Sequence, residues 1–107
     1  MVIKKEDQNL FRERLPRWQE NYTRQLLKDY VAFLDSDGVA LDKFWTLEKM
    51  IKKDKNTPGV QMRLSDKNLD DDLVKLIASR VIKVDDLNGF SNELKETVTW
   101  RIEQLSK

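Results

Sequence analysis

The sequence predicts an all-α or nearly all-α fold, a compact bundle of about four main helices in one small domain that spans residues 1–107. Apolar residues recur at steps of three and four along most of the chain, the spacing that places them on one face of a helix. Only three Gly and two Pro are present, fewer turn-forming residues than a loop-rich β protein requires. Hydrophobic residues make up 39% of the chain, enough to form a single core.

The longest periodic segment runs from residue 10 to residue 34. Pro16 interrupts its pattern, which predicts either a short helix followed by a main helix from about Pro16, or one kinked helix. Residues 1–9 are a polar lead-in that can fray, and the turn at 35–38 ends the segment because Gly38 can adopt a left-handed conformation. The apolar face of the segment holds Phe11, Leu15, Trp18, Tyr22, Leu26, Tyr30 and Phe33.

A second helix is expected over residues 40–53, followed by a break at 56–59. Its apolar set is Leu41, Phe44, Trp45, Leu47, Met50 and Ile51. Residues 60–64 then alternate between apolar and polar side chains, which is the period of a half-buried strand. The only β-branched run that could pair with them is 81–84, so a minimal two-stranded β pairing (60–64 with 81–84) and an extended loop are both open.

Two further helices complete the bundle. Ser65 is a suitable N-cap for a third helix that continues to about Ser79, with Leu69, Leu73, Leu76 and Ile77 directed at the core. A short capped turn at 85–90 ends at a glycine, and Ser91 then caps the last helix. The apolar stripe of that helix consists of Leu94, Val98, Ile102 and Leu105.

The composition excludes several kinds of chemistry. With no Cys and no His, the chain offers no disulfide, no thiol nucleophile, no Cys- or His-based zinc site and no His-based acid–base catalysis. A calcium loop centred on Gly38 fails, since it would place Phe33 and Phe44 at positions that require carboxylates. The triplet 70–72 cannot converge on one ion, since consecutive helical side chains point about 100° apart. We therefore predict a protein that is not an enzyme and needs no metal or cofactor.

A basic segment in the middle of the chain is the strongest charge signal. Residues 38–68 carry seven Lys or Arg against four Asp or Glu, although the whole chain has a net charge of only +1. Such a segment can contact phosphates, but lysines in a last helical turn also oppose the helix dipole and often do nothing more. This nucleic-acid alternative would use Lys43, Lys49, Lys52, Lys53, Lys55 and Arg63.

Two tryptophans are candidates for a partner-binding surface. Phe44 and Trp45 are adjacent, so that one can be buried while the other approaches the rim, and Trp100 lies off the stripe of the last helix. Tryptophan is enriched at protein interfaces. Packing at the edge of a small core is an equally good explanation for the position of each tryptophan. The predicted site consists of Trp45 and Trp100 with Lys49, Lys52 and Lys53 at its rim.

These observations predict a small, non-enzymatic interaction or regulatory module that binds a protein partner or a second copy of itself. No apolar run approaches the roughly 20 residues that span a bilayer, and the charged N-terminal residues do not resemble a signal peptide. A cytoplasmic location is therefore expected.

Overall fold

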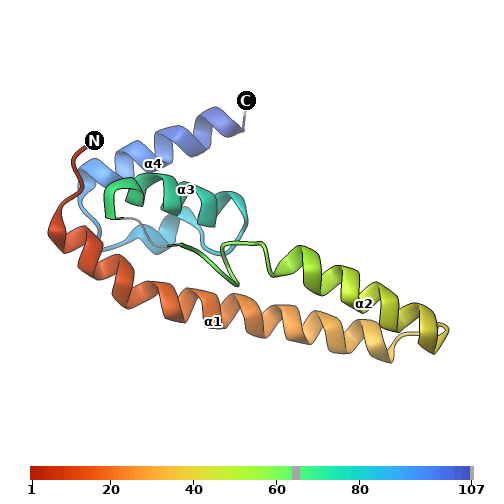
Figure 1. Ribbon diagram of the computed structural model, residues 1–107. Coiled ribbons are helices and arrows are strands. Elements are labelled where there is room, and N and C mark those ends of the chain that lie inside the picture. Colours follow the sequence, from red (N-terminus) through yellow and green to blue (C-terminus); the bar gives the residue numbers. More distant parts are fainter. Residues whose placement is uncertain (64–65, 107) are drawn as a thin grey trace.

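The computed structural model describes residues 1–63 and 66–106 of the chain (Figure 1). Four α-helices and two short 3₁₀ helices form the described part, and no strand occurs in it. The predicted all-α class with four main helices is confirmed. The elements are α1 (Lys5–Asp35), α2 (Ala40–Asp54), η1 (Asp66–Asn68), α3 (Leu69–Ala78), η2 (Val84–Leu87) and α4 (Asn92–Leu105).

Helix α1 is a single helix of 31 residues that runs the length of the molecule (Figure 1). Of the two arrangements that Pro16 allowed, the structure therefore has the continuous helix. Pro16 is exposed, so the carbonyl group that lacks a helical donor there can face water. The helix ends where the sequence predicts, and Gly38 in the following turn has a φ of 148°.

The hydrophobic core lies at one end of α1, between its first half and the elements α3, η2 and α4 (Figure 1). Trp18 is half-buried and packs against this core, with its ring centroid 6.2 Å from that of Phe11 and 6.5 Å from that of Phe90. The buried apolar residues are Phe11, Leu15, Leu69, Leu73, Val74, Leu76, Ile82, Leu87, Phe90, Leu94 and Val98.

The other half of α1 and the antiparallel α2 form a helical hairpin that extends away from the core (Figure 1). No residue of α2 is buried, so none of its apolar side chains enters the core. The molecule measures 52 × 31 × 20 Å, and its radius of gyration is 16.6 Å. A compact domain of this length would have a radius of gyration of about 13 Å, which shows how far the hairpin projects.

The proposed β pairing does not form among the described residues. Residues 60–63 are turn and irregular chain, and Leu64 lies outside the described residues. The second β-branched run instead begins in the turn by which the chain leaves α3. In this turn Arg80 has a φ of 64°, and the N–H of Val81 donates to the carbonyl oxygen of Leu76 at 2.9 Å. Because this Schellman-type exit uses the backbone of residues 80–82 to satisfy the last carbonyl groups of the helix, the run is not available as a strand.

Side-chain hydrogen bonds fix the start of α4. Ser91 caps α4 as predicted, with its Oγ accepting from the N–H of Leu94 at 3.4 Å. The Asp7 carboxylate joins this cap, accepting from the N–H of Ser91 at 2.9 Å and from its hydroxyl at 2.6 Å. Asn68 precedes α3 in place of the predicted Ser65, which lies outside the described residues.

Candidate functional site: the helical hairpin

The tip of the hairpin is closed by a lysine. The Lys43 ammonium group donates to the carbonyl oxygen of Leu34 at 2.9 Å and also to that of Ser36. These carbonyl groups lie at the C-terminal end of α1, where a positive charge also opposes the negative end of the helix dipole. Lys43 therefore has a structural role at the tip of the hairpin.

The base of the hairpin is held by polar contacts and one close packing contact between α1 and the chain that follows α2. Gln19 donates to the carbonyl oxygen of Pro58 at 3.0 Å, and Thr23 donates to that of Gly59 at 3.4 Å. Gly59 is buried directly against the ring of Tyr22, and a Cβ atom placed there would lie 2.2 Å from the Tyr22 Cδ1. The missing side chain at this position thus allows the loop after α2 to reach α1.

Between tip and base, the Tyr30 hydroxyl donates to the Asp54 carboxylate at 2.5 Å. Partial burial of the phenol, together with this hydrogen bond, raises the pKa of Tyr30 to about 12. Both effects favour the neutral phenol over the charged phenolate.

The stabilisation that Tyr30 gives should therefore be lost only at high pH. A tyrosine with a raised pKa in the folded state contributes fully below its unfolded pKa of about 10, and the contribution disappears as pH rises through about 12. Tyrosinate absorbance should show a late-titrating phase that is missing from Tyr30→Phe. Identical titration curves for the two proteins would contradict this assignment.

The outer surface of the hairpin carries an unusual number of exposed apolar side chains. Leu27, Val31 and Leu34 follow one face of α1 at steps of four and three. Phe44 and Trp45 are both exposed on α2, with their rings edge to face at 5.3 Å. The sequence allowed one of the two rings to be buried, but neither is. This surface, the hairpin face, consists of Leu27, Val31, Leu34, Val39, Leu41, Phe44, Trp45 and Ile51.

Two shallow hollows flank Phe44 on the hairpin face. The first, of about 390 Å³, is lined by Leu34, Gly38, Ala40, Lys43, Phe44 and Leu47. The second, of about 370 Å³, is lined by Phe44, Leu47, Glu48, Ile51, Lys52 and Lys55. Because Leu34 and Phe44 line the same hollow, apolar side chains of the two helices meet there.

The predicted basic residues differ in what they contact. Lys52 pairs with Glu48 at 2.7 Å, and this hydrogen bond raises the pKa of Lys52. Lys49 and Lys53 are exposed and make no ion pair within the described residues. Lys55 and Arg63 are likewise exposed. The C-terminal end of α2 thus presents several positive charges next to the apolar hollow.

The structure does not bring the two predicted tryptophans together. Trp45 lies on the hairpin and is 55% exposed, whereas Trp100 lies on α4, at the other end of the molecule, and is 61% exposed (Figure 1). Both are accessible, as a partner-binding residue must be. Only Trp45 lies beside the basic rim of Lys49, Lys52 and Lys53 on the same helix.

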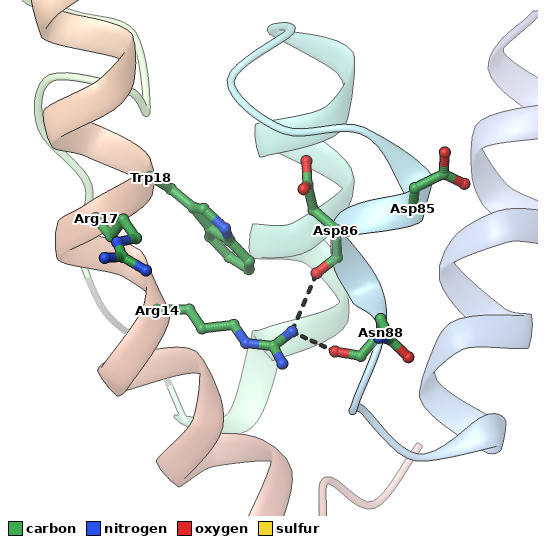
Figure 2. Close-up of a pocket in the computed structure, with 6 residues that line it drawn as sticks. All are labelled: Arg14, Arg17, Trp18, Asp85, Asp86 and Asn88. Atoms are coloured by element: carbon green, nitrogen blue, oxygen red, sulfur yellow. Dashed lines mark hydrogen bonds between the residues drawn. The ribbon is translucent and has the colours of Figure 1, made fainter.

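A third hollow, of about 300 Å³, lies between α1 and η2 and is lined by Arg14, Arg17, Trp18, Asp85, Asp86 and Asn88 (Figure 2). Figure 2 shows the Arg14 side chain reaching across it to the carbonyl oxygens of Asp86, at 3.1 Å, and Asn88. Its guanidinium also lies 5.4 Å from the centre of the Phe90 ring. A ligand would have to compete with the backbone for Arg14, so this hollow is a structural junction that fastens η2 to α1.

The acidic triplet of α3 has structural partners as well. Arg101 of α4 forms ion pairs with Asp70 at 3.2 Å and with Asp71 at 2.6 Å. Across residues 1–63 and 66–106, no group of three or more acidic side chains is placed to hold a metal ion. The two ion pairs join α3 to α4.

Comparison of the chain with protein-family models, with curated proteins and with solved structures finds no match. None of the helices in the described ranges is both long and apolar enough to cross a membrane. Function must therefore be inferred from the surface of the chain itself, on which the hairpin face is the most distinctive feature.

Proposed function

We propose that this protein is a non-enzymatic interaction or regulatory module that binds a protein partner through the hairpin face. One observation carries the proposal: α2 buries none of its residues in the core, yet it exposes Leu41, Phe44, Trp45 and Ile51. A helix with an apolar side is stabilised mainly by packing that side against another element. An extended apolar surface on a small protein is typical of an interaction site.

The chemistry of the hairpin face supports a protein partner. Aromatic residues at the centre of an interface contribute most to affinity when they enter a pocket on the other side. Lys49, Lys52 and Lys53 at its edge would orient the partner and increase the association rate. Hydrogen bonds of Tyr30 and Lys43 connect α2 to α1, and a surface that is already held in place loses less conformational entropy on binding.

Alanine variants of the two exposed tryptophans test this proposal. The full chain serves as bait in a pull-down from an extract of the cells that produce it. Trp45→Ala should reduce the amount of partner protein recovered about tenfold or more, the effect of losing a central aromatic contact. Trp100→Ala is the matched control, since it removes an equally exposed indole from α4 and should leave recovery unchanged. Loss of the partner with Trp100→Ala alone would place the binding surface on α4 and refute the proposed one.

The alternative function is nucleic-acid binding through the segment 43–63. The exposed charges of Lys49, Lys53 and Lys55 at the end of α2 favour it, while the structural use of Lys43 and the apolar hollow beside Lys52 favour a protein partner. Salt separates the two functions, since phosphate contacts weaken steeply as salt concentration rises. Recovery that survives high salt supports the protein partner, and recovery of nucleic acid that salt abolishes supports the alternative. In either case we propose a cytoplasmic location.

A further inference from the structure

We infer that the hairpin face binds a second copy of this chain, with the two hairpins antiparallel about a twofold axis near Leu47, the middle residue of α2. The inference rests on the proposed function and names the partner. In such an arrangement each copy presents the same surface to the other, so every contact occurs twice. The two helices of each hairpin would then complete a four-helix assembly.

The exposed apolar area is sufficient for a dimer. The eight side chains of the hairpin face are between 43% and 65% exposed. Together they present an apolar area on the order of the 800 Å² that each partner of a stable complex buries. Helix α2 alone, at 15 residues, is about 22 Å long, so two antiparallel hairpins can overlap along its whole length.

The shape of the surface is complementary to itself. Phe44 projects from α2 on one side of Leu47, and Ile51 lies in the second hollow on the other side. A twofold axis near Leu47 brings the Phe44 ring of one copy toward the Ile51 hollow of its partner, and the partner's Phe44 enters the equivalent hollow in return. An aromatic side chain that enters a pocket is the arrangement typical of energetic hot spots.

The charges of the hairpin are complementary in the same orientation. Its tip is acidic, because the exposed carboxylates of Asp35, Asp37 and Asp42 outnumber the ammonium group of Lys43, which is directed at backbone carbonyl groups. The opposite end of α2 is basic, because Lys49, Lys52, Lys53 and Lys55 outnumber Asp54 and Glu48, the partner of Lys52. Antiparallel packing places the acidic tip of each copy over the basic end of the other, whereas parallel packing would bring like charges together.

Solution mass and charge reversal test the inference on the full chain. At low ionic strength the wild-type mass should rise with concentration from the monomer value of 12.7 kDa to twice that value, and Phe44→Asp should remain monomeric. A tip variant, Asp35→Lys with Asp37→Lys, and a base variant, Lys52→Glu with Lys55→Glu, should each be monomeric alone. An equimolar mixture of the two should recover the doubled mass, because each tip then meets an opposite charge. Circular dichroism checks that every variant remains folded.

Three results would overturn the second copy as the occupant. The first is a wild-type mass that stays at the monomer value up to a protein concentration of about 1 mM, the weak end of specific association. The second is a dimer that persists in Phe44→Asp. The third is an equimolar mixture of the two charge variants that remains monomeric. If the wild type is monomeric but Trp45→Ala still reduces recovery of another protein, only the inference fails. If neither self-association nor partner recovery depends on the hairpin face, the proposed function fails as well.

Discussion

Leu73→Ala should lower the free energy of unfolding by about 2–5 kcal/mol, the range observed when a fully buried leucine is truncated. Leu73 is completely buried in α3, where that helix packs against α4 and the first half of α1. Removing three carbon atoms there forfeits their transfer free energy and leaves a cavity. Urea unfolding followed by circular dichroism would measure the change from the shift in midpoint.

The same substitution on the hairpin provides the control. Leu41 is 65% exposed, so Leu41→Ala should change the free energy of unfolding by no more than about 0.5 kcal/mol. Both proteins should be compared at high dilution, where self-association does not contribute. Equal losses for Leu73→Ala and Leu41→Ala would contradict the division between a buried core and an exposed hairpin.

That division explains why the sequence predicted the positions of the helices better than it predicted which other elements cover them. Phe11, Leu15, Tyr30 and Phe33 lie at helical spacing in one segment, and their periodicity correctly predicted a helix. The first two are buried and the last two are only half-buried, because different elements cover the two halves of α1. Periodicity reports the conformation of a segment, but it contains no information on which other segment packs against it.

The same limit of periodicity applies to the candidate site. The apolar pattern of α2 is the pattern of a core helix, and nothing in it indicates whether the covering element belongs to the same chain or to another. The exposure of Trp100 agrees with its position off the α4 stripe, because Leu94 and Val98 already determine the buried side of that helix. The exposure of both Phe44 and Trp45 could not be inferred in this way.

Contacts between residues distant in sequence were also beyond prediction. Arg14 bonds to backbone groups more than 70 residues away, and nothing about a single arginine on an amphipathic helix marks it for that role. Lys43 was predicted as a phosphate contact, but its position one turn into α2 brings it to the end of α1. A polar residue that caps another helix looks like any other surface residue in the sequence.

Asp7→Ala should lower the free energy of unfolding by about 2–4 kcal/mol. Asp7 is buried, although it lies in the first turn of a helix, and its two hydrogen bonds join α1 to Ser91 at the start of α4. Hydrogen bonds to a charged group are stronger than those between neutral groups. Alanine would leave the N–H and the hydroxyl of Ser91 without their acceptor. Chemical unfolding measures the loss, and Asp7→Asn, which keeps one acceptor oxygen, should lose less.

A double-mutant cycle with Ser91→Ala separates this contact from a general effect of altering the first turn of α1. Ser91 also caps α4 itself, so its single substitution should cost about 1 kcal/mol beyond the shared contact. If the carboxylate acts through Ser91, the double variant should be less destabilised than the sum of the two single variants by about 1 kcal/mol or more. Because Ser91→Ala keeps the N–H that donates to Asp7, strict additivity would show that Asp7 does not stabilise the protein through the Ser91 hydroxyl.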